Sequence, residues 1–189
     1  MPELGRKALH LLIAAVPSLA ALNRSHTALL LMAGILIYTC AESLRFLGFS
    51  LWFVSSVTAA VSREREQGHF VLGPVTLGLG ALLALLIFPP AVAALAVYVL
   101  AFADSASTVV GKFLGRLRPA FLSGKSVEGI LACFVAAALT GFLIFRDWRI
   151  AAAVGLASLI VDIFPAKDFD NLLLPLAAGF TALVFKSIF

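Results

Sequence analysis

Seven long apolar runs, separated by short polar turns, limit what this chain can fold into. They cover residues 7–22, 26–44, 70–88, 91–111, 127–145, 149–165 and 171–188. A helix needs about 20 apolar residues to cross the hydrocarbon core of a bilayer, and about 17–25 are tolerated. Hydrophobic residues make up 62% of the chain and charged residues 13%, too apolar a mixture for a small soluble core. We therefore expect an integral membrane protein.

The expected fold is an all-α transmembrane bundle of about seven spans, because backbone polar groups in lipid must be satisfied within each span. Short turns such as Pro89-Pro90 make consecutive spans antiparallel neighbours. Residues 47–62 mix aromatic and hydroxyl side chains at helical spacing. They predict one interfacial amphipathic helix, with a further short span as the alternative. We expect a single domain over residues 1–189, with the first run retained as a span rather than removed as a leader.

The charges divide unevenly between the two sides of such a bundle. Seven spans place Arg24, Arg146, Arg149 and Lys186 on one side and all other Lys and Arg residues on the side of the N-terminus. The positive-inside rule then puts the N-terminus in the cytoplasm, in a bacterial-type inner or plasma membrane. All acidic residues except Asp147 fall on that same side. This pattern predicts a polar site at the cytoplasmic face.

Asp104 is the first candidate for chemistry, since it lies within a long apolar stretch. A carboxylate in a span costs about 2.5–3.5 kcal/mol on insertion scales unless it is paired or hydrated. Small and polar residues follow it at positions suited to nucleotide binding: Ser107, Thr108, Gly111 and Gly115. Close helix packing of the small-xxx-small type is an alternative explanation for the two glycines.

A basic segment follows. Its cations and a candidate helix cap suit the phosphates of a nucleotide: Lys112, Arg116, Arg118, Lys125 and Ser126. Plain positive-inside topology explains the same cations. Glu128 lies in the first turn of the next span and is a supporting residue.

A third cluster, at the junction of the last two spans, predicts a Mg²⁺ site. Its candidate ligands are Asp162, Asp170 and Asn171, with Asp104 from the earlier span. Asp and Asn at a loop also serve as helix caps. Two further pairs are supporting residues: Glu42 with Arg45 at i, i+3, and Arg63 with Glu66 in a run that a solvated surface also explains. His10, His26 and His69 share no spacing typical of metal ligands.

These motifs resemble the polyprenol kinase family, which includes dolichol kinase, phytol kinase and the CTP-dependent diacylglycerol kinase. The similarity lies in Asp104-Ser105-Ala106, Gly111, Gly115, Lys125-Ser126, Glu128-Gly129, Asp170-Asn171 and Pro175. The chain departs from the family pattern at Ala103, where glycine is usual, and at Asp162, where glutamate is usual.

The resemblance implies transfer of the γ-phosphoryl group of a nucleoside triphosphate, CTP favoured, to the hydroxyl of a lipid alcohol. Asp104, Lys125 and Asp170 would be catalytic, with Mg²⁺ as cofactor and membrane lipids as surroundings. No nucleic acid is expected as a partner, and the glycine-rich faces permit a homodimer. Two alternatives stay open: a cytidylyltransferase that forms a CDP-lipid, and a proton- or cation-coupled lipid transporter that uses Asp104 within the membrane.

Overall fold

A computed structural model describes residues 8–49, 69–122, 124–164 and 169–188. All regular secondary structure in these ranges is helical. The first helical segment, Ala8–Leu22, contains a 3-10 turn, η1 (Ile13–Ala15), followed by α2 (Val16–Leu22). The remaining elements are α3 (Arg24–Phe46), α5 (Gly73–Ile87), α6 (Pro90–Phe113), η3 (Ala120–Leu122), α7 (Val127–Phe145), α8 (Trp148–Ile163) and α9 (Asp170–Ile188).

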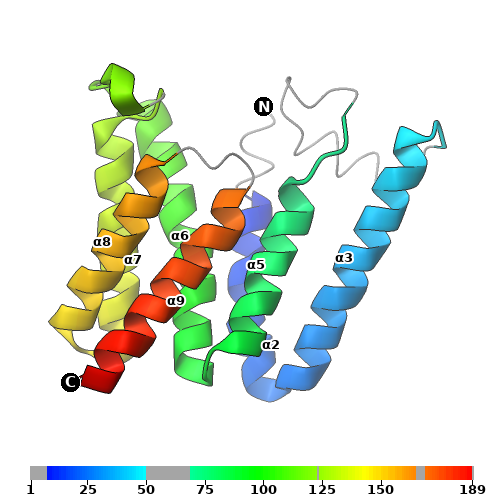
Figure 1. Cartoon of the computed structure of the whole chain (residues 1–189), viewed down its shortest axis with the longest axis horizontal. Helices are drawn as coiled ribbons and strands as arrows, with labels where there is room; N and C mark the ends of the chain where they lie inside the picture. The colour runs from blue at the N-terminus through cyan, green and yellow to red at the C-terminus, as the bar shows by residue number, and fades with distance from the viewer. Residues whose placement is uncertain (1–7, 50–68, 123, 165–168, 189) are drawn as a thin grey trace.

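The helices run alternately up and down, so that the start of the first helical segment and the end of α9 lie at opposite ends of the bundle (Figure 1). Local sequence sets the reversals. Asn23 caps α3 by accepting a hydrogen bond from the His26 backbone N–H at 2.9 Å. Pro90 begins α6 only three residues after α5 ends at Ile87. Arg146 takes a left-handed conformation (φ 55°), and Asp147 caps α8.

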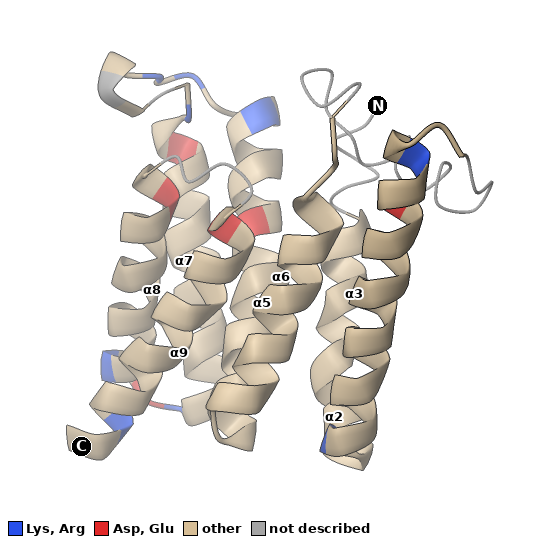
Figure 2. Cartoon of the chain, turned by 45° about the vertical axis from the view of Figure 1, so that its right-hand side comes forward, with Lys and Arg blue, Asp and Glu red and all other residues tan. Residues whose placement is uncertain are grey.

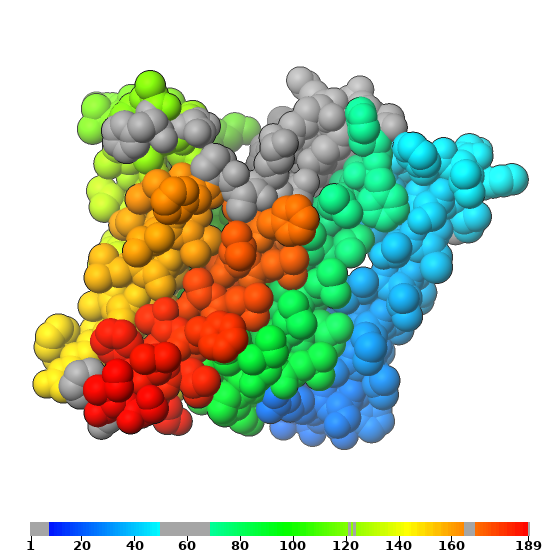
Figure 3. Space-filling view, in the orientation of Figure 1, coloured from blue at the N-terminus to red at the C-terminus, as the bar shows by residue number. Residues whose placement is uncertain are grey.

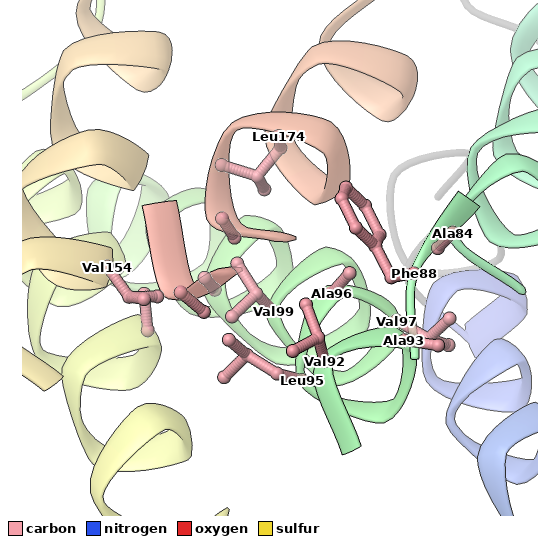
Figure 4. Packing of buried hydrophobic residues seen from close by; sticks show 14 of the residues in the cluster. Ala84, Phe88, Val92, Ala93, Leu95, Ala96, Val97, Val99, Val154 and Leu174 are labelled. Atoms are coloured by element: carbon pink, nitrogen blue, oxygen red, sulfur yellow. The ribbon is translucent and has the colours of Figure 1, made fainter. Parts of the chain in front are cut away.

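α6 is the central helix of the bundle. It packs against α5, α7 and α9 and also contacts the first helical segment. Its buried side chains form the middle of the apolar core, including Val92, Leu95 and Val99, and meet Phe88, Val154 and Leu174 from neighbouring elements (Figure 4). α3 is peripheral and packs mainly on α5 and α2. The candidate site residues on α6 are therefore held by the best-packed part of the molecule.

Four helices are long and apolar enough to cross a membrane: α3, α6, α7 and α9. The segments Ala8–Leu22 and Gly73–Ile87 are apolar but shorter, and α8 has 16 residues. Large apolar side chains are exposed on the outer surface, such as Leu30, Ile37 and Leu143. Figure 3 shows one face of the molecule, with α9 in front. This surface is consistent with a membrane protein.

The expectation of an all-helical bundle is confirmed, and each predicted apolar run contains a helix whose ends lie within about three residues of the expected positions. How many helices cross the bilayer stays a prediction. So do the cytoplasmic placement of the N-terminus and the type of membrane. Of the amphipathic segment 47–62, residues 50–62 lie outside the described residues, as do Arg63 and Glu66.

Charged residues gather at the two ends of the bundle and leave the helix middles nearly free of charge (Figure 2). Among the residues that the structure describes, most acids lie at the end where α6 and α8 finish and where α7 and α9 begin. We call this the polar end. The opposite end carries the cations that the sequence placed apart from the rest, among them Arg24 and Lys186, together with Asp147. At this end the Arg24 guanidinium donates hydrogen bonds to the backbone oxygens of Leu85 and Phe88. These bonds satisfy carbonyl groups at the C-terminal end of α5.

Candidate functional site

Four elements meet at the polar end and bring together a lysine, two carboxylates and a hydroxyl. Ser107 comes from α6, Lys125 precedes α7, Asp162 ends α8 and Asp170 begins α9. We call these four residues the carboxylate–lysine cluster. The sequence predicted each of them as a site residue, although 63 positions separate Ser107 from Asp170. The structure places them in one small volume.

Lys125 is the centre of this cluster. Its Nζ lies 2.8 Å from Asp162 Oδ1 and 4.0 Å from Asp170 Oδ2, and it also donates to the Asp162 backbone oxygen. The Ser107 hydroxyl donates to Asp162 Oδ2 at 2.7 Å. Both carboxylate oxygens of Asp162 are thus engaged. The three charged side chains are 11–28% exposed, so the cluster is shielded yet open to a ligand from the polar end.

The charges of the cluster do not cancel, because one ammonium faces two carboxylates. Asp170 lies in the first turn of α9, where the helix dipole favours an anion. Asp162 lies in the last turn of α8, where the dipole disfavours one. Lys125 therefore lies closest to the acid whose position in its helix is less favourable, Asp162.

Close contact between α6 and α7 fixes the position of Ser107. A Cβ added at Gly129 would lie 2.7 Å from the Ser107 backbone oxygen and 3.1 Å from Gly111 Cα. The Ser126 hydroxyl, which caps α7 by accepting from the Gly129 N–H at 3.1 Å, sits beside Gly111 and Gly115. These glycines thus serve helix packing, as the small-xxx-small alternative predicts. A nucleotide-binding role for Gly111, Gly115 and Ser126 stays a prediction.

Hydrogen bonds made by two side chains, those of Arg118 and Glu128, hold the basic segment between α6 and α7 in place. Arg118 donates to the backbone oxygens of Gly111 at 2.6 Å and Gly124 at 2.7 Å. Glu128 accepts from the backbone N–H groups of Arg116 and Leu117 at 3.0 and 3.1 Å. Arg118 and Glu128 thus shape the segment.

The other predicted nucleotide-binding residues of this region are Lys112, Arg116 and Thr108. The Lys112 and Arg116 side chains are exposed at the polar end, and Thr108 is half-buried on α6. Cations in this position suit an approaching polyphosphate.

Asp104 lies one helical turn from Ser107, deeper within α6, and pairs with a residue that the sequence argument missed. His10 Nδ1 lies 2.9 Å from Asp104 Oδ2, and the histidine side chain is 1% exposed while that of Asp104 is 20% exposed. Sequence reasoning weighed the histidines only as metal ligands. Two features of the sequence could have indicated this pair. A carboxylate inside a span needs a partner, and His10 is a titratable residue inside the first apolar run.

Asn171 is buried at the contact between α5 and α9. Its amide nitrogen donates to Thr76 Oγ1 at 3.0 Å and to the Gly73 backbone oxygen at 3.4 Å. These two hydrogen bonds hold the start of α9, and with it Asp170, against the start of α5. Asn171 thus positions the site, and its role as a metal ligand stays a prediction.

Glu42 and Arg45 form a second polar group at the same end, as their spacing predicted. Arg45 donates through two nitrogens to the two Glu42 carboxylate oxygens, at 2.6 and 2.8 Å. Glu42 is fully buried and also accepts from the Val71 N–H at 3.0 Å. Arg45 donates to the His69 backbone oxygen at 2.9 Å. The pair joins the end of α3 to the segment that leads into α5.

Two of the four predicted magnesium ligands, Asp162 and Asp170, lie beside the Lys125 ammonium group. Among the described residues there is no group of three or more His, Cys, Asp or Glu side chains arranged to hold a metal ion. Asp162 and Asp170, however, both lie within 4.0 Å of one ammonium group. Mg²⁺ commonly takes one or two protein carboxylates and completes its shell with water and substrate phosphates. The donor set of Asp162 and Asp170 suits that mode of binding, whereas Asp104 is paired with His10.

Comparison with known proteins gives one informative match. An uncharacterized protein of Methanocaldococcus jannaschii is 29% identical over 187 residues, which cover 95% of this chain and 92% of that protein. The two chains are thus similar over nearly their whole lengths. No protein-family model matches the chain. No solved structure matches it either.

Proposed function

We propose that the protein is a membrane-embedded lipid kinase. It transfers the γ-phosphoryl group of a nucleoside triphosphate, CTP favoured, to the hydroxyl of a lipid alcohol of the polyprenol, phytol or diacylglycerol type. The observation that carries the proposal is the carboxylate–lysine cluster at the polar end of an apolar helical bundle. The resemblance of residues 104–129 and 162–175 to the polyprenol kinase family supports the same activity.

Phosphoryl transfer suits this set of residues because the protein needs mainly to position the reactants and to neutralise phosphate charge. Mg²⁺ held by Asp162 and Asp170 would neutralise charge on the β- and γ-phosphates. Lys125 binds the phosphate chain beside them, and the exposed cations Lys112 and Arg116 attract it to the polar end.

Asp104 acts on the lipid hydroxyl in this proposal. The hydroxyl oxygen forms the new bond to the γ-phosphorus, the bond from that phosphorus to the bridging oxygen breaks, and the nucleoside diphosphate leaves. The hydroxyl proton passes to the Asp104 carboxylate, which His10 orients from 2.9 Å. Asp104 lies about 14 Å along α6 from its polar end and one helical turn from Ser107, so the lipid hydroxyl would meet it below the carboxylate–lysine cluster.

The test is transfer of label by the purified protein. The protein is incubated with Mg²⁺, a mixture of long-chain alcohols and each γ-labelled nucleoside triphosphate in turn. Label in the lipid fraction, together with release of the nucleoside diphosphate, is the expected result. In a parallel incubation with a lipid phosphate in place of the alcohols, label in lipid from α-labelled CTP, with release of pyrophosphate, would instead identify a cytidylyltransferase.

One observation favours a second function, coupled transport of a lipid. His10 and Asp104 form a titratable pair within apolar helices, and such pairs mark proton routes in transporters. Nucleotide-independent lipid movement in proteoliposomes, driven by a proton gradient and lost on Asp104→Asn, would establish that function. We favour the kinase because transport does not require the cluster formed by Lys125, Asp162 and Asp170.

A further inference from the structure

An apolar groove runs along one side of the bundle, between the first helical segment, α3 and α5. Its cavity volume is about 480 Å³. Leu12, Ile13 and Val16 line it from the first segment, Leu31 and Ile35 from α3, and Leu77 from α5. The lining is apolar apart from Thr27 near one end and Tyr38 near the other.

The length of the groove corresponds to one leaflet of a bilayer. It reaches from Leu9 to Leu19 on the first segment and from Thr27 to Tyr38 on α3. Ten or eleven residues of helix measure about 15 Å, which is half of the ~30 Å hydrocarbon thickness. A groove of this length accommodates one extended hydrocarbon chain whose polar group stays at the polar end.

The end of the groove at Leu9 lies one residue from His10, the partner of Asp104. Leu9 lines the groove and precedes His10, which turns to Asp104 on α6. Across the groove, Tyr38 lies one helical turn before the buried Glu42, and its hydroxyl is 3.4 Å from the Val71 backbone oxygen. Tyr38 and the residue that precedes His10 thus lie at this end, and a hydroxyl at the head of a bound chain would lie beside them.

We propose that this groove binds the hydrocarbon chain of the lipid alcohol and directs its hydroxyl toward Asp104. The proposal rests on the proposed kinase function for the identity of the substrate. The occupant is a single long chain with a small hydroxyl head. Selectivity then follows from burial of apolar surface along the groove, so longer alcohols bind more tightly until the chain fills it.

Gly34 offers a direct way to fill the groove. It lines the cavity, and a Cβ added there meets no atom within 4 Å. Gly34→Phe therefore adds a large side chain at a position where the Cβ has space beside the cavity, and Gly34→Leu is a milder version. Ala33 is the matched control, because it is the adjacent exposed residue of α3 and does not line the groove.

The experiment uses hexadecanol that carries a photoreactive diazirine on its chain, with the full-length protein in nanodiscs and no nucleotide present. After irradiation, mass spectrometry is expected to place the label on groove residues such as Leu12 and Leu31, with unlabelled hexadecanol competing. Gly34→Phe should lower the labelling about tenfold or more, Gly34→Leu by less, and Ala33→Phe not at all. Thermal unfolding establishes that the three variants are equally folded.

Equal labelling of Gly34→Phe and Ala33→Phe would overturn the proposal. So would equal labelling by a diazirine phosphatidylcholine that hexadecanol does not displace, since the groove would then hold ordinary bilayer lipid. A cross-link between two chains through the groove would show a second copy as occupant and would also overturn it. Because no nucleotide is present, these outcomes are independent of kinase activity. If transfer occurs, Gly34→Phe should raise KM for hexadecanol with little change in kcat, whereas Ala33→Phe changes neither.

Discussion

Lys125 joins the two carboxylates of the candidate site, and its position has two consequences. Its ammonium offsets the repulsion between Asp162 and Asp170. It is also the cation best placed to bind a phosphate held at the same carboxylates. Mutation can distinguish the two roles, because loss of the first lowers the stability of the protein and loss of the second lowers the rate of phosphoryl transfer.

Lys125→Met keeps the length of the side chain and removes its charge. We expect phosphoryl transfer to fall about 10²-fold or more, as when one stabilising donor is removed from other active sites. Stability should fall as well, because Asp162 and Asp170 lose their counter-charge. The double variant Lys125→Met with Asp162→Asn relieves that repulsion and should recover thermal stability without recovering transfer. Recovery of transfer in the double variant would show that Lys125 only neutralises Asp162 and that transfer does not need a metal held by the Asp162 carboxylate.

Asp104→Asn tests the proposed base with almost no change of shape. The amide retains a polar contact to His10, so the fold and nucleotide binding should persist. Removal of a general base typically costs about 10²–10⁴-fold in rate, and we expect a loss of kcat in that range. The measurement is label transfer at saturating nucleotide, with thermal unfolding as the control. Wild-type turnover from a folded Asp104→Asn protein would remove Asp104 from the catalytic group.

The site residues were predictable from sequence because charge is costly in an apolar span, which made Asp104, Asp162 and Asp170 conspicuous. The i, i+3 pairing of Glu42 with Arg45 followed from helix geometry alone. The pairing of His10 with Asp104 did not, since it depends on how the first segment packs on α6. The backbone contacts of Arg118 were equally hidden, because they depend on the path of the chain between α6 and α7.

At the scale of elements, the contact between α6 and α7 determines the geometry of the cluster. It brings the Ser107 backbone against Gly129, while the Ser107 hydroxyl reaches Asp162 on α8. Neither backbone can yield without moving a whole helix. A small change in the distance between α6 and α7 would therefore move Ser107 relative to Asp162.

Gly129→Ala tests this contact with a single methyl group. The added Cβ would meet backbone atoms of Ser107 and Gly111 at 2.7 and 3.1 Å, so we expect a loss of about 1–3 kcal/mol in unfolding free energy. Transfer should fall too, because Ser107 moves relative to Asp162. Gly73→Ala is the matched control, since its Cβ meets nothing within 4 Å. The measurement is unfolding in mixed detergent; equal stability of the two variants would contradict the packing argument.

Helix positions were predictable because apolar length and turn residues such as Asn23 and Pro90 mark the ends of each run. The apolar pattern within each helix did not predict two features of the bundle. One is the peripheral place of α3, which opens the groove beside the first segment. The other is the central place of α6, which three neighbouring helices and the first segment surround. Both depend on side-chain packing between elements rather than on the pattern within one.

The whole molecule separates its charges by end, and this separation leads to a topology prediction. If all seven helices cross the bilayer, the turn between α2 and α3 and the end of α9 face the side opposite the segment between α6 and α7. The positive-inside rule puts that segment, with Lys112, Arg116 and Arg118, in the cytoplasm. Whether all seven helices cross the bilayer needs an experimental test, because Ala8–Leu22 and Gly73–Ile87 are below the usual length for a span.

Single cysteines test the topology in a background with Cys40→Ala and Cys133→Ala. Ser25→Cys, Ala120→Cys and Ser187→Cys place one thiol each at exposed positions in the α2–α3 turn, the α6–α7 segment and the end of α9. An impermeant maleimide added to intact cells should label positions 25 and 187 at once and position 120 only after permeabilisation. Labelling of positions 25 and 120 from one side would mean that the helices between them cross an even number of times. Gly73–Ile87, the short helix between these positions, would then lie in the membrane without crossing it, and the groove beside α3 would open at a different depth. The opposite pattern, with position 120 alone labelled in intact cells, would place the candidate site outside the cytoplasm, away from the nucleoside triphosphates that a kinase requires.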